Sequence, residues 1–221
     1  MNLLSLIGIR RRMYRAFDDK ASEAPISYAV MACNEAEQLD GLLGLIEKHL
    51  RTQDELTVQV DAEKGTEEVR AVVAKHREHI AAYGEYAVNG DFATAKNHLN
   101  SLCRGEYIFQ LDADETPTPL LIEKLPNIIA ANPGIELFKI ARNNCFDNQD
   151  GSFSQMSSWP DYQGRIFRNL DRIAWHRPLH EKIRGHERYV YMPKDVNLAI
   201  IHHKNRQSDL DKWQQWREQQ A

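Results

Sequence analysis

The sequence has few cysteines, and their spacing suggests neither a cross-link nor a zinc site. Cys33, Cys103 and Cys145 are the only three in 221 residues, and no two of them form a C-x-x-C pair. A disulfide framework requires an even set of cysteines, and a cysteine-based zinc site requires paired ones, so neither is indicated. The composition is typical of a protein in a reducing compartment, and we expect a cytoplasmic location.

Long hydrophobic runs are also absent. The first apolar stretch ends at Ile9 and is followed by three arginines, Arg10 to Arg12. A membrane span needs about 20 apolar residues, and a signal peptide carries its positive charge before the apolar stretch, so neither is expected. Residues 1–24 are predicted to form an N-terminal amphipathic helix with Leu3, Leu4, Ile7, Tyr14 and Phe17 on one stripe. This helix either packs on the domain or makes peripheral contact with an anionic membrane at its inner face, and both interpretations stay open.

The chain lacks a strong excess of charge and lacks two well-known phosphate-binding loops. Its 28 Lys and Arg against 32 Asp and Glu give a formal charge of −4, too little of either sign for a general nucleic-acid coat. It contains neither G-x-G-x-x-G nor G-x-x-x-x-G-K-[ST], which argues against dinucleotide-dependent oxidoreductases and P-loop proteins. What it does contain is 42% hydrophobic residues, enough for a sizeable core, and nine histidines.

Hydrophobic periodicity predicts an α/β fold. Apolar runs at residues 26–32, 56–60, 86–88 and 107–111 read as strands, and helical patterns separate them. The helix after the second run is expected to begin behind Thr66 and to end near Gly84. The order βαβαβαβ predicts a mostly parallel sheet with right-handed crossovers. Such sheets bind ligands at the carboxyl ends of their strands.

Polar and acidic residues follow three of these strands. They are Cys33-Asn34-Glu35, Asp61-Ala62-Glu63 and Asp112-Ala113-Asp114-Glu115. Alternate residues of a strand point the same way, so Asp112 and Asp114 are expected to lie on one side. Two close carboxylates repel each other unless a cation lies between them, and oxygen ligands suit Mg²⁺ or Mn²⁺. The alternative is that these aspartates cap a helix that opens at Thr116 and Pro117.

Five segments resemble family 2 glycosyltransferases of the GT-A fold, in particular a small bacterial and phage branch related to lipopolysaccharide-core sugar transferases. They are ISYAVMACNEAEQL, VQVDAEKGTEEV, DFATAKNHLNSLCRGEYIFQLDADE, YQGRIFRNLDRIAWHRPLHEKI and IIHHK, in the family's order. The resemblance implies one GT-A (Rossmann-like) domain over residues 25–204, with a nucleotide-binding half (25–115) and an acceptor-side half (116–204). Residues 205–221 are expected to form a C-terminal helix.

The resemblance also implies an activity. A nucleoside-diphosphate sugar, most often a UDP-sugar, would donate its sugar to an acceptor hydroxyl with inversion, assisted by Mn²⁺ or Mg²⁺. The acceptor stays open between a glycan, as in lipopolysaccharide biosynthesis, a protein side chain and a modified nucleic-acid base, and the oligomeric state stays open too. Two other functions remain: a nucleotidyltransferase that makes sugar nucleotides, and a nucleotide- or carbohydrate-binding protein without turnover. The first normally has a glycine-rich basic loop where this chain has CNEAEQL.

Site residues of the first half follow from the same resemblance. Asn34 and Glu35 would border the nucleotide, and Asp61 would contact its base or ribose. Lys96 would lie near the donor phosphates, or else is a solvated helix lysine. Asp112 would hold ribose or metal, and Asp114 would be the main metal ligand.

The second half is richer in basic residues and histidines. From Trp175 to Arg206, seven Lys and Arg stand against three acids, and five of the nine histidines follow Asp171. An inverting transfer requires a carboxylate to accept the proton of the acceptor hydroxyl. Glu181, in a segment that resembles the family's W…HE, is the first candidate, and Asp161 is its competitor.

Further candidates of this half contact phosphate or metal. Arg165 and Arg168 are candidate phosphate or acceptor contacts. His202 and His203 follow a predicted strand over residues 196–201, and either is a candidate metal ligand, because adjacent strand residues face opposite ways.

Overall fold

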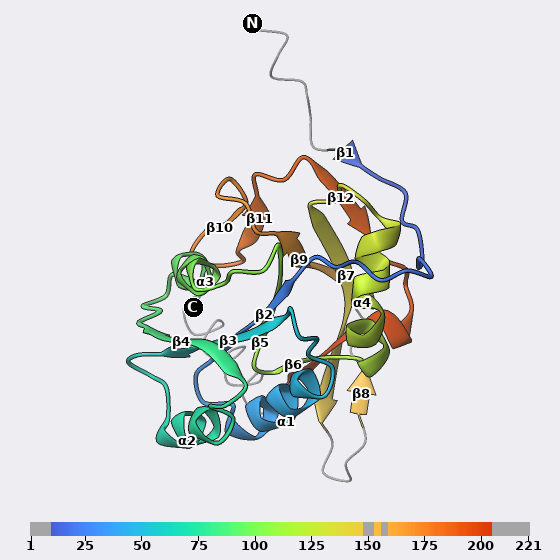
Figure 1. Cartoon of the computed structure of the whole chain (residues 1–221). Helices are drawn as coiled ribbons and strands as arrows, with labels where there is room; N and C mark the ends of the chain where they lie inside the picture. Colours follow the sequence, from blue (N-terminus) through green and yellow to red (C-terminus); the bar gives the residue numbers. More distant parts are fainter. Residues whose placement is uncertain (1–9, 148–152, 156–158, 205–221) are drawn as a thin grey trace, which may run out of the picture.

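A mixed sheet runs through the computed structural model, which describes residues 10–147, 153–155 and 159–204 (Figure 1). The elements of the first part of the chain are β1 (Arg10–Arg11), β2 (Ile26–Ala32), α1 (Ala36–Glu47), β3 (Glu55–Asp61), α2 (Glu67–Lys75), β4 (Ile80–Tyr86), α3 (Phe92–Ser101) and β5 (Tyr107–Asp112). From β2 to β5 the chain alternates between strands and helices. Strands β4, β3, β2 and β5 lie side by side and parallel in that order. The predicted βαβαβαβ order and parallel sheet are therefore confirmed.

The second part of the chain extends the same sheet with mixed strand directions. Its elements are β6 (Glu115–Pro117), α4 (Pro119–Ala131), β7 (Leu137–Asp147), β8 (Phe153–Gln155), β9 (Asp161–Arg168), β10 (Ala174–His176), β11 (Lys182–Arg184), β12 (Arg188–Tyr191), the 3-10 helix η2 (Val196–Leu198) and β13 (Ile200–Lys204). Strand β9 is antiparallel to β5 and β7, which flank it. Beyond β7 come β12 and β1, while β13 pairs with both β7 and β6.

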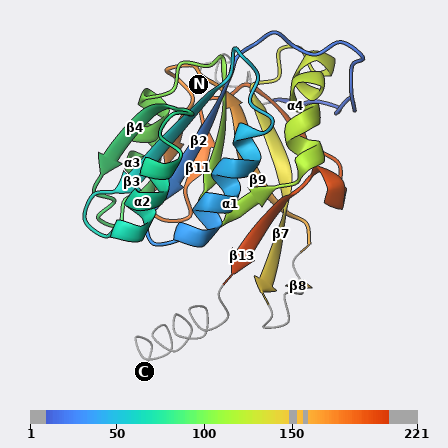
Figure 2. The same cartoon turned by 60° about the horizontal axis from the view of Figure 1, so that its bottom comes forward.

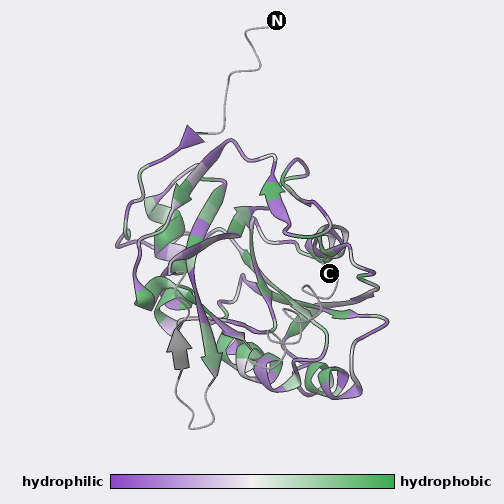
Figure 3. Ribbon diagram, turned by 180° about the vertical axis from the view of Figure 1, so that it is seen from behind, coloured by the Kyte–Doolittle hydropathy of each residue, from purple (hydrophilic) through white to green (hydrophobic). Residues whose placement is uncertain are grey.

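Helices cover both faces of the sheet (Figure 2). The alternating residues of β2, β3 and β5 that face α1, α2 and α4 form the main core, with Tyr28, Val58 and Phe109 among its fully buried members. The opposite face packs against α3 and the β10–β11 hairpin through residues such as Leu99, Phe167 and Trp175. Figure 3 shows hydrophobic residues gathered on these strands and on the inner faces of the helices. Apolar burial on this scale is the main source of stability for the scaffold.

The second helix and the third strand differ from the sequence prediction. Helix α2 ends at Lys75, and β4 begins at Ile80. Gly84, which was expected near the end of the helix, lies inside β4. The helix does begin behind Thr66, whose side chain accepts a hydrogen bond from the Val69 amide at 3.3 Å. The apolar residue Ile80, which fits the helical stripe, pairs with Leu56 of β3 in the structure. Tertiary pairing therefore overrides local periodicity here.

The predicted N-terminal helix is wrong where the structure describes it. Residues 10–24 contain the strand β1 and an extended segment, and residues 1–9 lie outside the described ranges. The amides of Arg10 and Arg12 donate to the carbonyls of Glu187 and Tyr189 along β12, and Ser22 donates to Pro126 of α4. Backbone groups that would bond within a helix are satisfied by other elements. None of the helices in the described ranges has the length and hydrophobicity of a membrane span.

The elements near the C-terminus differ in their bounds from the sequence prediction. The strand predicted over residues 196–201 is wrong in its bounds, because residues 196–198 form η2 and β13 runs from Ile200 to Lys204. His202 and His203 therefore lie inside a strand, where their side chains alternate. The helix predicted for residues 205–221 lies outside the described residues.

Candidate active site

A cavity of about 570 Å³ opens at the carboxyl ends of β2, β3 and β5. This is the edge at which a parallel sheet presents its ligand site. The lining includes most of the residues predicted from the sequence: Asn34, Glu35, Asp61, Lys96, Asp112, Asp114, Glu181 and His202. It also includes three residues that the sequence analysis did not select, Lys64, Arg142 and His180. Five acidic and three basic side chains line the cavity, so it carries an excess of negative charge.

The turns after β2 and β3 line part of the cavity and are fixed by carboxylate hydrogen bonds. Glu35 accepts from the amides of Cys33 (2.9 Å) and Asn34 (3.0 Å), which fixes the turn after β2. Asp61 accepts from the amides of Glu63 (2.9 Å) and Lys64 (3.1 Å), which fixes the turn after β3. Both carboxylates keep one oxygen outside these bonds. The two turns therefore present acceptors to the cavity in a fixed geometry.

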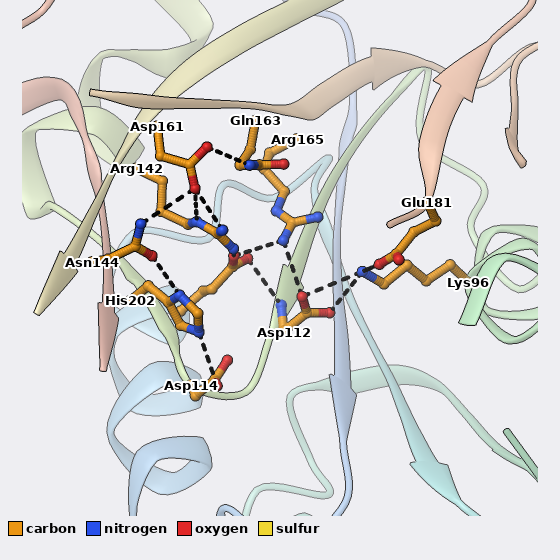
Figure 4. Close-up of polar contacts among 11 residues, drawn as sticks. Lys96, Asp112, Asp114, Arg142, Asn144, Asp161, Gln163, Arg165, Glu181 and His202 are labelled. Atoms are coloured by element: carbon orange, nitrogen blue, oxygen red, sulfur yellow. Dashed lines mark hydrogen bonds and ion pairs between the residues drawn. The ribbon is translucent and has the colours of Figure 1, made fainter. Parts of the chain in front are cut away.

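Lys96 joins two of the predicted site residues. Its Nζ lies 2.6 Å from Glu181 Oε1 and 3.2 Å from Asp112 Oδ1, and only 1% of its side chain is exposed (Figure 4). The same ammonium lies 4.8 Å from the centre of the Trp175 ring. A buried lysine is stable when its charge is paired in this way. Lys96 is thus a buried connector between β5 and the loop that carries Glu181, which corrects the alternative of a solvated helix lysine.

Asp114 and His202 form a pair of metal-type ligands. His202 Nε2 lies 3.2 Å from Asp114 Oδ2, and His202 Nδ1 lies 2.7 Å from Asn144 Oδ1. The Asn144 amide nitrogen donates to Asp161 at 3.3 Å, so its oxygen accepts from the imidazole Nδ1–H. The other ring nitrogen, Nε2, faces the Asp114 carboxylate. A cation between the two atoms satisfies both, and Mn²⁺ accepts this mixed nitrogen and oxygen set.

These ligands fit a cation that is held partly by its substrate. No group of three or more His, Cys, Asp and Glu side chains forms a ready metal cage in the part of the chain that the structure describes. Divalent ions at nucleotide sites commonly take one or two carboxylates together with phosphate oxygens and waters. Asp114 and His202 supply such a partial set, and Asp112 lies on the neighbouring strand end.

A network of buried charges supports the cavity from behind. Glu115 is fully buried and accepts from Arg165 (2.6 Å) and Arg142 (2.8 Å). Arg165 also contacts Asp112 at 3.0 Å, and Arg142 contacts Asp161 at 2.7 Å (Figure 4). Burial raises the pKa of Glu115, but the charges of Arg165 and Arg142 outweigh it and hold that pKa below its ordinary range. Glu115 stays ionised and aligns both arginines.

Four predicted site residues lie elsewhere than expected. Arg168 pairs with Glu106 beside Tyr107, at the opposite end of β5 from Asp112, so the proposed phosphate contact is wrong. Arg165 is buried behind the cavity and acts through Asp112 and Glu115. Asp161 does not line the cavity, and four hydrogen bonds from Arg142, Asn144 and Gln163 engage its carboxylate. His203 donates its amide to the Asp114 carbonyl, while the ring of His202 faces the Asp114 carboxylate.

Two residues of the network escaped the sequence analysis. Glu115 directly follows the Asp-Ala-Asp tripeptide, so the DADE sequence did contain a signal. Arg142 lies in β7, far along the chain, and nothing in its local sequence marks it. Its partners come from β6 and β9, and only the sheet order brings them together.

The fold and the site together define a class of protein. A parallel nucleotide-binding type of sheet, an acidic cavity at its carboxyl edge and an Asp-x-Asp at the end of β5 are the features of GT-A enzymes. The sequence matches the family model "Glycosyl transferase family 2" over residues 27–187. The chain therefore belongs to this family. A search of curated proteins gave no significant match.

Two solved structures are similar to this chain at low sequence identity, and the first of them shares its fold. Staphylococcus aureus TarS residues 1–349, in complex with UDP-GlcNAc, matches with a TM-score of 0.57 and 14% identity over 82% of this chain and 59% of that one. The mannosyltransferase PcManGT from Pyrobaculum calidifontis, with GDP-Man and Mn²⁺, gives 0.48 and 19% over 58% of this chain and 39% of that one. This chain therefore spans about 40 to 60% of the length of these relatives.

Proposed function

We propose that the protein transfers a sugar from a nucleoside-diphosphate sugar to an acceptor hydroxyl, with inversion and with the help of Mn²⁺ or Mg²⁺. One observation carries this proposal: Asp112, Asp114 and His202 line the same acidic cavity at the carboxyl ends of the parallel strands, and His202 Nε2 lies 3.2 Å from Asp114 Oδ2. A donor diphosphate is itself negative, so a cavity with five acids and three bases holds it well only with a divalent cation. The S. aureus neighbour, whose structure holds UDP-GlcNAc, supports this donor class and a UDP-sugar first.

The lining residues divide into two groups by chemistry. Asn34, Glu35 and Asp61 offer acceptors and a carboxamide for the ribose and base. Lys64, Lys96 and Arg142 are the cations that line the cavity, and Lys64, which forms no ion pair among the described residues, is the candidate contact for the diphosphate. The divalent ion, held by Asp114 and His202, would neutralise the charge that develops on the departing diphosphate.

Glu181 is the better candidate for the base that accepts the acceptor proton. It lines the cavity, whereas Asp161 does not. Burial raises the pKa of Asp161, but hydrogen bonds and charge from Arg142 outweigh it and hold that pKa below its usual value. A proton acceptor must reach the substrate, and Asp161 lies outside the cavity lining with both carboxylate oxygens engaged in hydrogen bonds. Glu181 keeps Oε2 outside its ion pair with Lys96.

The competing functions are weaker on this geometry. A nucleotidyltransferase would need a basic, glycine-rich loop after β2, but that turn is closed by the Glu35 carboxylate. A binding protein without turnover would need no base, and Glu181 beside a buried lysine is then unexplained. We propose a glycan hydroxyl as the acceptor, with lipopolysaccharide core as the first class to examine, and a cytoplasmic location.

The test is turnover of a donor panel. UDP-, GDP- and dTDP-sugars are incubated with the protein and Mn²⁺, and release of nucleoside diphosphate is measured. We expect metal-dependent release from at least one donor, and Glu181→Gln should lower transfer to added glycan acceptor by about a hundredfold while donor binding stays unchanged. Glu123→Gln, an exposed glutamate on α4, is the matched control. No metal-dependent release from any donor would overturn the proposal.

A further inference from the structure

A second cavity lies away from the active site, between the N-terminal strand and the end of helix α4. Its volume is about 390 Å³, and its lining includes Arg12, Arg15 and Arg188, with Met13 at its edge. No acidic residue belongs to this lining, and none of the lining residues belongs to the catalytic cavity. Figure 1 shows β1 and β12 at the upper edge of the molecule, away from β6 in the lower half.

Arg12 and Arg15 are held in place by their backbones and form no ion pair among the described residues. The backbone of Arg12 donates to Tyr189, and the backbone amide and carbonyl of Arg15 both bond to the Asn132 side chain at 2.9 and 2.7 Å. Neither Arg12 nor Arg15 has a carboxylate within ion-pair distance among the described residues. Backbone anchoring of this kind fixes where the side chains start and leaves the guanidinium groups for a ligand.

Arg188 is the third arginine that lines the second cavity. Its guanidinium packs over Gly134, where an added Cβ would lie 3.1 Å from Nη1, and Gly134 has a φ of +75°. Its contact with Glu136 is long, at 3.7 Å, because Arg172 takes that carboxylate at 2.8 Å. The Nε of Arg188 is buried and has no hydrogen-bond partner in the described structure. Two arginines without an ion pair among the described residues, beside a third that shares its carboxylate with Arg172 and keeps an unsatisfied donor, make a site for a phosphate group.

We propose that this arginine pocket (Arg12, Arg15 and Arg188) docks the protein on the phosphate headgroups of an anionic membrane. The surroundings favour a lipid surface. Met13, between Arg12 and Arg15 in sequence, is 90% exposed, and Phe17, two residues after Arg15, is 46% exposed. The nine residues before Arg10, MNLLSLIGI, contain five Leu and Ile and no charged side chain. Arginines interleaved with exposed apolar residues are characteristic of segments that lie in a membrane interface.

The contact does not depend on the amphipathic helix that the sequence suggested. In the structure, Arg10 and Arg11 pair with β12, Arg15 bonds to Asn132 after α4, and these tertiary contacts bring Arg12 and Arg15 to the same cavity as Arg188. Arg10 and Arg11 are exposed on the same strand and add to the positive potential. The proposal is independent of the proposed transferase activity, since no residue is shared between the two cavities.

Vesicle sedimentation with the full chain tests the proposal. Vesicles of phosphatidylcholine with 30% phosphatidylglycerol are compared with pure phosphatidylcholine at about 0.1 M salt. The triple variant Arg12→Gln, Arg15→Gln, Arg188→Gln is compared with Lys48→Gln, Arg104→Gln, Lys124→Gln, which removes the same charge from other surfaces. We expect the wild type and the control to bind anionic vesicles, and the pocket variant to bind at least tenfold more weakly. Thermal unfolding shows that both variants are folded.

Three results would overturn the proposal. The first is no preference of the wild type for anionic vesicles. The second is an equal loss in the two triple variants, which would mean that general charge and not the pocket decides binding. The third is calorimetric binding of inorganic phosphate or glycerol phosphate by the wild type without vesicle binding, which would assign the pocket to a soluble ligand.

Discussion

The two arginine clusters of the molecule use the same side chain in opposite ways. Arg142 and Arg165 are largely buried and each contacts two carboxylates behind the catalytic cavity. Arg12 and Arg15 are exposed and have no carboxylate partner among the described residues. A guanidinium enclosed by carboxylates fixes the position of its neighbours, whereas one without partners is available to recognise an anion. Pairing, more than residue type, therefore separates scaffold from binding surface.

The largest effect is expected where the buried network meets the cavity, at Asp114. Asp114→Asn keeps the shape of the side chain but removes a negative ligand, so metal-assisted release of nucleoside diphosphate should fall by about a thousandfold. Initial rates at saturating donor and Mn²⁺ measure this. Asp19→Asn, an exposed aspartate on the N-terminal segment, should leave the rate unchanged. A loss of less than threefold in Asp114→Asn would remove Asp114 from the mechanism.

The same arginine-to-methionine substitution in each cluster tests whether ion pairing determines the contribution of an arginine to stability. Arg165→Met leaves Glu115 buried with one partner, and we expect the free energy of unfolding to fall by about 3 kcal/mol. Arg12→Met removes an exposed, unpaired charge and should change it by less than about 0.5 kcal/mol. Urea denaturation measures both. Equal effects of the two substitutions would show that pairing does not distinguish the clusters.

Glu136 forms ion pairs with Arg172 and Arg188 and should make the free energy of unfolding depend on pH. Burial raises the pKa of Glu136, but hydrogen bonds from Arg172 and from the Glu187 amide outweigh it and lower the pKa to about 2. A lowered pKa stabilises the fold above the ordinary glutamate value, and this stabilisation is lost as the pH falls from about 4.5 toward 2.

We therefore expect the wild type to lose about 2 kcal/mol more than Glu136→Gln between pH 5 and pH 2.5. Denaturation curves at several pH values measure the difference. Parallel curves for the two proteins would contradict the assignment of Glu136 as an ionised, paired carboxylate.

The smallest effect is expected from Asn97, which holds the hairpin that carries Glu181. The Asn97 amide donates to the Trp175 carbonyl at 2.9 Å and accepts from the Trp175 amide at 2.8 Å, so it joins α3 to β10. Asn97→Ala should cost about 1 kcal/mol and lower kcat with little change in donor affinity, because Glu181 is displaced. Asn97→Asp keeps one of the two bonds and should restore part of kcat. A loss of donor affinity without a loss of kcat would argue against this positioning role.

Much of the fold was readable from local patterns. The βαβαβαβ order, the apolar strands and the acidic ends of β2, β3 and β5 depend on residues close together in sequence, and these predictions agree with the structure. The helix predicted over residues 1–24 failed in its described part: the prediction depended on the local spacing of five apolar residues, whereas β12 and α4 supply the hydrogen-bond partners of the backbone. The ends of α2 and β4 failed for the same reason, since Ile80 fits either period.

The site was predicted best where motif and strand end coincide. Asp112, Asp114 and Glu181 were found by resemblance, and the cavity brings them together. Arg142, Glu115 and Asn144 were not, because their importance comes from contacts between strands that are far apart in sequence. Arg168 had the right charge in a matching segment, but β9 runs antiparallel to β5 and carries it to the wrong end. Strand direction in the second half was not available from hydrophobic periodicity.

Calorimetric titration of UDP, GDP and dTDP, each with and without Mn²⁺, tests the central claim most directly. The claim is that the acidic cavity binds a nucleoside diphosphate through a cation on Asp114. We expect Mn²⁺ to tighten the binding of at least one of these nucleotides tenfold or more in the wild type, and we expect Asp114→Asn to remove this gain. No binding of any nucleotide, or equal binding with and without Mn²⁺, would contradict it.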